Sequence, residues 1–314
     1  MSRCIPFVSQ ISDREIAEWL EALRSVLPGY DVMPLADCSM QQCAEAQVAI
    51  VANPHAADLK KLPHLQWVQS LWAGVDQLLI ETQLNNVAIV RMNDPQLAET
   101  MAEAVLTWAL SLHRDMPRYR MQQSLQIWQQ HTAKLAAERT VGILGLGNLG
   151  RKAAKRLFSN GFRVLGWSRS RAELKGIETF CGAAGFTAML QRVDILICLL
   201  PLTAQTQGLI GKDAIALMPK GSALINFARG PIVDTDALMS ALNSDRLSHA
   251  VLDVFDQEPL PQTSPLWSHP NITILPHISA PTNRQTASLI VAKNINRFFV
   301  EGEIPLSVDR ALGY

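Results

Sequence analysis

The sequence predicts an α/β protein in which helices cover parallel sheets, and three observations support this class. Short apolar runs alternate with longer segments of helical periodicity along almost the whole chain, as expected for parallel strands joined by helices. The length of 314 residues exceeds one typical hydrophobic core, which indicates two domains. A hydrophobic content of 48% and equal numbers of basic and acidic residues, 28 of each, are typical of a globular chain with no bias toward nucleic acid or a membrane surface.

The first hundred residues are expected to form a small doubly wound domain. Its clearest helix covers Asp13–Val26, and the final helix, Arg284–Val300, is expected to return to this domain. The predicted strands are Ile5–Ser9, Asp31–Leu35, Val48–Ala52, Trp67–Leu71 and Val87–Arg91.

A long helix is predicted over Glu99–Met116, because apolar residues recur there at spacings of three and four, and Pro117 is its expected end. The apolar residues are Met101, Ala104, Val105, Trp108, Leu112 and Met116. Six further strands follow, a number suited to a nucleotide-binding sheet. They are Val141–Leu144, Arg163–Trp167, Ile195–Leu199, Ala223–Phe227, Val251–Val254 and Thr273–Leu275.

A glycine-rich turn joins the first of these six strands to a helical segment. It consists of Gly145, Leu146, Gly147, Asn148, Leu149 and Gly150. In such a turn the first glycine allows the sharp bend, the second lets backbone N–H groups approach a pyrophosphate, and the third permits close helix–strand packing. A tight turn without a ligand is the alternative, but the strands on both sides favour a Rossmann domain that binds a nicotinamide cofactor.

The end of the second strand indicates which cofactor is preferred. An acidic residue at this position would accept hydrogen bonds from the ribose of NAD and repel the 2′-phosphate of NADP. Here the residue is Ser168, followed by Arg169, and hydroxyl and guanidinium groups suit a phosphate. Solvated arginines in a loop are the simpler explanation. We predict a preference for NADP(H), with NAD(H) less favoured.

Three polar residues follow later strands of the predicted sheet, at the edge where open α/β sheets bind ligands. They are Arg229, Glu258 and His277, and they supply a fixed cation, an acid and a titratable imidazole. Each alone has a structural explanation, namely a surface ion pair, a turn before proline or a loop cap. Their shared edge of the sheet favours a joint catalytic role.

Cysteine usage and the apolar segments limit the other possibilities. The cysteines, odd in number and without a Cys-x-x-Cys pair, indicate reduced thiols rather than a disulfide framework or a metal site. They are Cys4, Cys38, Cys43, Cys181 and Cys198. Because we find neither a signal-peptide core nor an apolar stretch long enough to span a membrane, a cytoplasmic protein is expected.

Taken in order, these motifs resemble the D-isomer-specific 2-hydroxyacid dehydrogenases, and most closely the glyoxylate/hydroxypyruvate reductases. The segments that carry the resemblance are Trp72–Asp76, Glu99–Met116, Gly145–Gly150, Leu200–Thr203, Ala228–Gly230, Leu252–Pro259 and Pro276–His277. The resemblance implies an NADP-binding Rossmann domain over 99–283 and a smaller flavodoxin-like substrate domain over 1–98 and 284–314. It also implies an active site in the cleft between them.

The resemblance assigns chemical roles to the polar residues. Arg229 would bind the carboxylate and the 2-oxo group of the substrate. His277 would donate a proton to the developing alkoxide, while Glu258 would orient the imidazole and favour its charged form. Ala73 and Gly74 belong to the loop that receives the substrate carboxylate, although a simple turn is the alternative. Trp72 is hypothesised to limit the pocket to short 2-oxo acids.

The resemblance also implies roles for further residues, some of which have an alternative explanation. Asp253 would face the nicotinamide carboxamide or be structural, and Ala228 belongs to the cofactor site. Pro201 and Thr206 would lie near the adenosine half. A homodimer is implied through Glu99–Met116, unless its apolar stripe is wholly intramolecular. Trp128 would reach a partner's active site or fill an interface or core.

The predicted function is therefore NADPH-dependent reduction of glyoxylate to glycolate and of hydroxypyruvate to D-glycerate. A dinucleotide-sensing binding protein of the corepressor type is the rival, because fold alone does not determine function. A dehydrogenase for another 2-hydroxy acid is a further alternative. Formate oxidation is disfavoured, since formate dehydrogenases place a glutamine where Glu258 stands.

Overall fold

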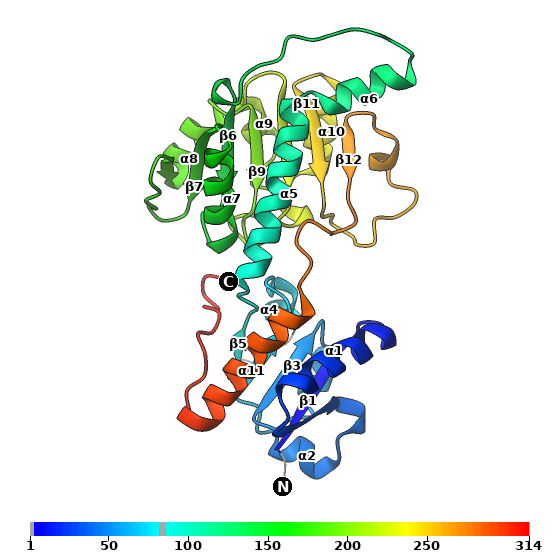
Figure 1. Cartoon of the computed structure of the whole chain (residues 1–314), viewed down its shortest axis with the longest axis vertical. Coiled ribbons are helices and arrows are strands. Elements are labelled where there is room, and N and C mark those ends of the chain that lie inside the picture. Colours follow the sequence, from blue (N-terminus) through cyan, green and yellow to red (C-terminus); the bar gives the residue numbers. More distant parts are fainter. Residues whose placement is uncertain (1–2, 82–85, 314) are drawn as a thin grey trace. The chain divides into compact units, whose positions relative to one another are not determined.

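The computed structural model describes residues 3–81 and 86–313, and the chain divides into two compact units (Figure 1). Unit 1 comprises Met1–Gln96 and Thr282–Tyr314, and unit 2 comprises Leu97–Pro281. Each boundary lies two residues before the predicted one, at 96 rather than 98 and at 281 rather than 283.

Unit 1 contains a five-stranded parallel sheet with the order β2-β1-β3-β4-β5. The strands are β1 (Arg3–Ser9), β2 (Tyr30–Pro34), β3 (Val48–Ala52), β4 (Trp67–Ser70) and β5 (Ala88–Val90). All five predicted strands are present, and this order is the one found in flavodoxin-like folds. The small doubly wound domain is confirmed.

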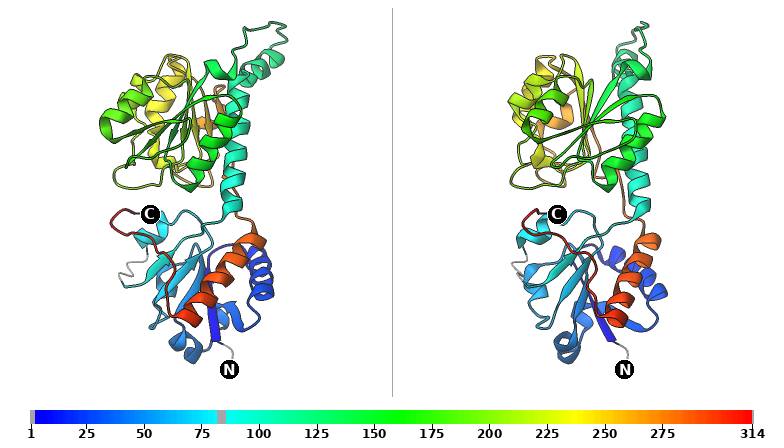
Figure 2. Two further views of the ribbon diagram at one scale, coloured as in Figure 1. Left: turned by 60° about the vertical axis from the view of Figure 1, so that its left-hand side comes forward. Right: turned by 90° about the vertical axis from the view of Figure 1, so that its left-hand side faces the viewer.

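Two long helices pack side by side on one face of this sheet, α1 (Asp13–Val26) and α11 (Arg284–Glu301) (Figure 2). Ser12 caps α1 in a capping box, and Gly302 ends α11 in the left-handed conformation with φ of +74°. The shorter helices of unit 1 are η1 (Leu35–Asp37), α2 (Met40–Glu45), α3 (Ala56–Leu59) and α4 (Asp76–Glu81). The expected return of the final helix to the first domain is therefore correct.

Unit 2 contains a seven-stranded parallel sheet with the order β12-β11-β10-β9-β6-β7-β8. The strands are β6 (Thr140–Leu144), β7 (Arg163–Ser168), β8 (Glu178–Cys181), β9 (Ile195–Cys198), β10 (Ser222–Asn226), β11 (Leu247–Leu252) and β12 (Ile272–Ile274). The six predicted strands are present, but β11 begins four residues before the predicted Val251 and ends two residues before the predicted Val254. The edge strand β8 was not predicted, because none of its residues is buried and its sequence lacks an apolar run.

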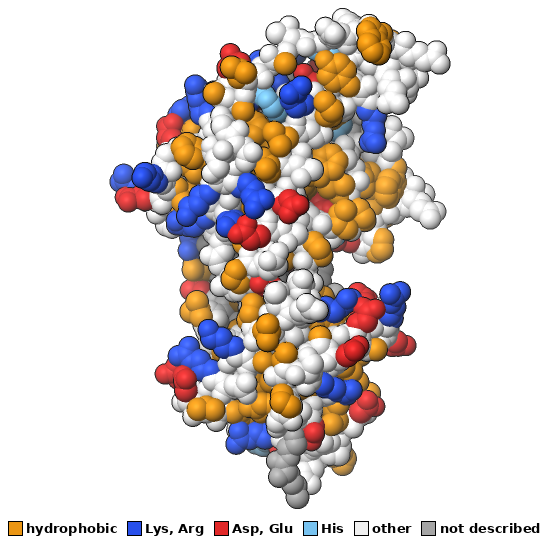
Figure 3. Space-filling view, viewed as in Figure 1, with side chains coloured by type: hydrophobic (Ala, Val, Ile, Leu, Met, Phe, Trp, Pro, Cys, Tyr) orange, Lys and Arg blue, Asp and Glu red, His pale blue; other side chains and the backbone are white. Residues whose placement is uncertain are grey.

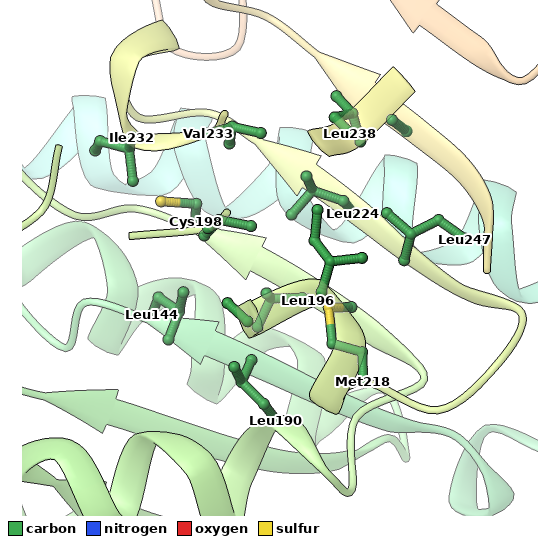
Figure 4. Close-up of a cluster of buried hydrophobic side chains, with 14 of the residues drawn as sticks. Leu144, Leu190, Leu196, Cys198, Met218, Leu224, Ile232, Val233, Leu238 and Leu247 are labelled. Carbon is green, nitrogen blue, oxygen red and sulfur yellow. The ribbon is translucent and has the colours of Figure 1, made fainter. Parts of the chain in front are cut away.

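Helices cover both faces of this second sheet (Figure 2). They are α5 (Pro95–His113), α7 (Asn148–Ser159), α8 (Gly182–Leu190), α9 (Lys212–Leu217) and α10 (Thr235–Asn243). Helix α6 (Met116–Ser124) extends away from the sheet, and the short turns are η2 (Ala136–Glu138), η3 (Gly230–Ile232) and η4 (Pro265–Ser268). In one core cluster, Leu144, Leu196 and Leu224 from three adjacent strands are fully buried (Figure 4). Strands this apolar are typical of a sheet that is covered on both faces.

The long helix differs from the prediction at its C-terminal end. It runs from Pro95 to His113 rather than from Glu99 to Met116, and a turn with Asp115 at φ of +52° separates it from α6. Pro117 does not end the first helix. It lies in the first turn of α6, where the missing proline N–H would have no partner in the helix anyway.

The surface carries basic and acidic side chains interspersed with apolar ones on the face shown in Figure 3, in keeping with the equal numbers of both charges. Among residues 3–81 and 86–313, no helix combines the length and the apolar character needed to cross a membrane.

Candidate active site

The glycine-rich turn lies between β6 and α7, where the sequence places it. Gly145 has φ of +101°, and a Cβ atom there would lie 2.7 Å from the Leu199 carbonyl oxygen. Its N–H donates to the Trp167 carbonyl at 2.8 Å. Both the dihedral angle and the close approach exclude a side chain, so this turn requires glycine.

The other two glycines differ from each other in a way that fits a bound pyrophosphate. A Cβ on Gly150 would lie 1.8 Å from the Gly145 carbonyl oxygen, so this glycine permits close packing of α7 on the turn. A Cβ on Gly147 would meet nothing within 4 Å. Gly147 is the N-cap of the 12-residue helix α7 and contributes no side-chain cap. Open space at a helix N-terminus is suited to a phosphate group.

Strand β7 ends at Ser168, and Arg169 follows it directly. Ser168 Oγ donates to the Ser170 carbonyl at 2.7 Å, and this bond shapes the turn that follows the strand. Arg169 is exposed. No acidic residue occurs in the run 168–171, so no carboxylate in this run would repel a bound phosphate.

Thr206 shapes the loop that follows β9. Its hydroxyl donates to the Pro201 carbonyl at 2.7 Å and accepts from the Thr203 N–H at 2.8 Å. Thr206 therefore holds this loop in a compact form. Pro201 is half-buried, and any contact of these residues with adenosine stays a prediction.

His277 and Glu258 form a hydrogen-bonded pair, with 2.7 Å between His277 Nδ1 and Glu258 Oε2. This bond raises the pKa of His277 above its ordinary value, against partial burial and the Arg229 charge, which lower it. Burial raises the pKa of Glu258, but hydrogen bonds from His277 and from the Phe255 N–H outweigh this effect and lower it overall. The pair thus favours a charged imidazole beside an ionised carboxylate.

The backbone of His277 is held in an unusual conformation, with φ of +54°. Asp253 explains how this is maintained: its carboxylate accepts from the N–H groups of Ile278 at 2.7 Å and Ser279 at 2.9 Å. Asp253 is 0% exposed. Of the two roles left open for it, the structure shows the structural one, because both oxygens anchor the His277 loop, and its contact with a carboxamide stays a prediction.

Arg229 follows β10 and lies close enough to the pair for its charge to lower the pKa of both Glu258 and His277. Asn226 fixes the turn before it, since its side chain accepts from the Ala228 N–H at 3.1 Å and donates to the Arg229 carbonyl at 2.9 Å. A Cβ on Gly230 would lie 2.1 Å from the Phe255 carbonyl carbon, so this glycine lets the two loops approach. Sequence reasoning gave neither Asn226 nor Gly230 a positioning role.

The loop that follows β4 in unit 1 contains the other predicted site residues. The Trp72 N–H donates to Ser70 Oγ at 3.0 Å, and the Trp72 carbonyl accepts from the Met92 N–H at 2.9 Å. The Trp72 ring packs edge-on against Trp19, with 6.1 Å between centroids.

The next two residues of this loop, Ala73 and Gly74, are half-buried. Their N–H groups make no hydrogen bond to any other residue that the structure describes. Backbone N–H groups can donate to an anionic ligand, and this role for Ala73 and Gly74 stays a prediction.

Comparisons with known proteins identify the family of this chain. Residues 106–279 match the family model "D-isomer specific 2-hydroxyacid dehydrogenase, NAD binding domain". A D-isomer specific 2-hydroxyacid dehydrogenase from Xanthobacter autotrophicus Py2, crystallised with NADPH and MES, is 35% identical, with a TM-score of 0.93 and 100% of each chain covered.

Two further solved structures are similar over the same length. The NADPH-dependent glyoxylate/hydroxypyruvate reductase of Sinorhizobium meliloti, in complex with NADP and sulfate, is 33% identical, with a TM-score of 0.91 and 99% of each chain covered. A probable 2-hydroxyacid dehydrogenase from Rhizobium etli CFN 42, in complex with NADP, HEPES and L(+)-tartaric acid, is 32% identical with a TM-score of 0.90, covering 99% of this chain and 100% of that one. This chain belongs to the D-isomer-specific 2-hydroxyacid dehydrogenases, and unit 2 contains the family's nicotinamide-dinucleotide-binding domain.

Proposed function

We propose that this protein reduces glyoxylate to glycolate and hydroxypyruvate to D-glycerate, with NADPH as the reductant. The observation that carries the proposal is the hydrogen-bonded pair His277–Glu258 with the Arg229 charge close by, in a member of a 2-oxo acid reducing family. Similarity to an NADPH-dependent glyoxylate/hydroxypyruvate reductase supports the choice of substrates.

The three polar residues of unit 2 divide the chemistry between them. The cofactor, when bound, supplies a hydride to the 2-oxo carbon. Arg229 binds the carboxylate and polarises the 2-oxo group, because a guanidinium can donate two parallel hydrogen bonds. Since His277 Nδ1 is bonded to Glu258, its Nε2 is the nitrogen that gives a proton to the substrate oxygen. Glu258 holds the ring and keeps it charged.

The loop Trp72–Gly74 is proposed to bind the substrate carboxylate through the N–H groups of Ala73 and Gly74. Trp72 would limit the substrates to short 2-oxo acids, because its ring is held against Trp19. Comparing phenylpyruvate with glyoxylate tests this. Equal rates for the two acids would contradict the proposed size limit.

Cofactor preference rests on unit 2. We propose that Ser168 and Arg169 bind the 2′-phosphate of NADPH, and crystal structures of two relatives with NADP and of one with NADPH support this choice. Gly147 and the α7 N-terminus would hold the pyrophosphate, and Ala228, with Pro201 and Thr206, would line the cofactor site.

We also propose that the protein is a cytoplasmic homodimer. The apolar stripe of α5 is packed inside unit 2, with Met101, Val105 and Leu112 in the core. One group of exposed apolar residues lies on α6 and the segment after it, where Trp128 is 97% exposed. The others are Met116, Met121, Leu125, Ile127 and Leu135. Sedimentation velocity of the wild-type chain and of Trp128→Ala tests the proposal.

The decisive experiment follows NADPH consumption with glyoxylate, hydroxypyruvate and pyruvate, each repeated with NADH. Fast turnover of the first two acids with NADPH is the expected result. If NADPH binds and no 2-oxo acid is reduced, the protein is a dinucleotide sensor or acts on another substrate.

A further inference from the structure

A glutamine lies in the core of unit 1, where an apolar residue would serve a strand equally well. Gln69, on β4, is 0% exposed. Its amide Nε2 donates to the carbonyls of Ser70 at 3.0 Å and Val90 at 3.3 Å, and its Oε1 accepts from Asn294 Nδ2 at 2.8 Å. Burying an amide costs free energy unless it is paired, and here it is paired three times. Such a network is suited to fixing a conformation.

The network leads directly to the loop that follows β4. The Ser70 carbonyl accepts from Gln69, and the Ser70 hydroxyl accepts from the Trp72 N–H at 3.0 Å. The Trp72 carbonyl accepts from the Met92 N–H at 2.9 Å. Hydrogen bonds therefore connect Asn294 on α11, through Gln69 and Ser70, to Trp72, the residue before Ala73.

We propose that Asn294 and Gln69 are positioning residues that hold the Trp72–Gly74 loop with its two N–H donors converging on a carboxylate. The inference rests on the proposed function, because that function assigns the loop its ligand. The carboxylate is present in both the ground state and the transition state, so a misplaced loop weakens both equally. Loss of such uniform binding raises KM and leaves kcat nearly unchanged.

A purely structural role is the competing explanation, because Asn294 also ties α11 to the sheet. Val291 provides the matched control. It lies one helical turn earlier on α11 and is fully buried in a cluster of hydrophobic residues that includes Trp67 and Leu71 of the same region. Val291→Ala weakens helix packing without touching the hydrogen bonds.

The test compares Asn294→Leu with Val291→Ala. Leucine has a similar size but no donor, so Gln69 Oε1 loses its partner. We expect the KM for glyoxylate to rise about tenfold, with kcat within about twofold and the KM for NADPH unchanged. Val291→Ala should lower the melting temperature at an unchanged KM. Gln69→Met should reproduce the KM effect, and Asn294→Ala replaces Asn294→Leu if that variant does not fold.

Hydrogen exchange of residues 71–75 gives a readout that needs no turnover. Exchange should be faster in Asn294→Leu than in the wild type, and unchanged in Val291→Ala. Parallel KM increases in both variants, or unchanged exchange in Asn294→Leu, would overturn the inference. If the wild type reduces no 2-oxo acid, the proposed function fails, and the exchange rates alone then decide whether Asn294 holds the loop.

Discussion

Replacing Glu258 by glutamine should shift the pH dependence of reduction. The hydrogen bond to Glu258 raises the pKa of His277; burial and Arg229 lower it, and the Asp253 charge raises it slightly. Glutamine keeps the size of the side chain and an oxygen that can accept from Nδ1–H, but it removes the negative charge. The pKa of His277 should therefore fall. Because reduction needs protonated His277, the alkaline limb of the kcat profile should move to lower pH.

The size of the effect follows from the exposure of the pair. The His277 and Glu258 side chains are 52% and 36% exposed, so solvent weakens their interaction. An exposed ion pair contributes about 0.2–1 kcal/mol and a hydrogen bond to a charged group about 1.5–3 kcal/mol. Glutamine keeps an acceptor for the hydrogen bond and removes only the charge, so we take about 1 kcal/mol, the upper end of the ion-pair range, as the energy lost by protonated His277. This energy corresponds to about a fivefold lower kcat on the alkaline limb.

The assay follows NADPH oxidation with saturating glyoxylate from mildly acidic to alkaline pH. Oxidation of glycolate with NADP requires neutral His277, so its acidic limb should also move to lower pH. Asp256→Asn is the control, because it removes a carboxylate from the same loop that is not the partner of His277. If the pH–rate profiles of Glu258→Gln match those of the wild type, or if the alkaline limb of reduction moves to higher pH, the assignment of His277 and Glu258 is refuted.

Three further predictions concern unit 2. Gly147→Ala should fold normally, since its Cβ enters only open space, but it should raise the Kd for NADPH at least about tenfold in a cofactor titration, because that space is proposed to hold the pyrophosphate. Gly150→Ala should instead lower the melting temperature strongly, as measured by circular dichroism. Arg169→Glu should lower kcat/KM for NADPH about tenfold or more and leave that for NADH nearly unchanged. Burial, together with the nearby His269, lowers the pKa of His249 to about 4. The wild type should therefore lose stability as pH falls from about 6.5 toward that value. The urea midpoint of unfolding should fall less over this pH range in His249→Gln than in the wild type.

The sequence predicted what depends on short local patterns. The glycine turn and the polar residues after β10, β11 and β12 could be placed because parallel strands bring their carboxyl ends to one edge. Local patterns failed at two points. The edge strand β8 buries no residue and has no apolar run, and the break between α5 and α6 depends on a left-handed Asp115 that propensity does not indicate.

Residues that position the site could not be found in this way, because their partners are distant in the sequence. Gln69 and Asn294 are 225 positions apart, and Asp253 binds N–H groups 25 and 26 positions later. Hydrogen bonds of this kind exist only once the fold has formed. Substitutions in the catalytic and in the positioning residues should therefore have different effects. Changes at His277 or Glu258 should alter proton transfer and its pH dependence. Changes at Gln69 or Asn294 should leave the chemical step intact and weaken substrate binding.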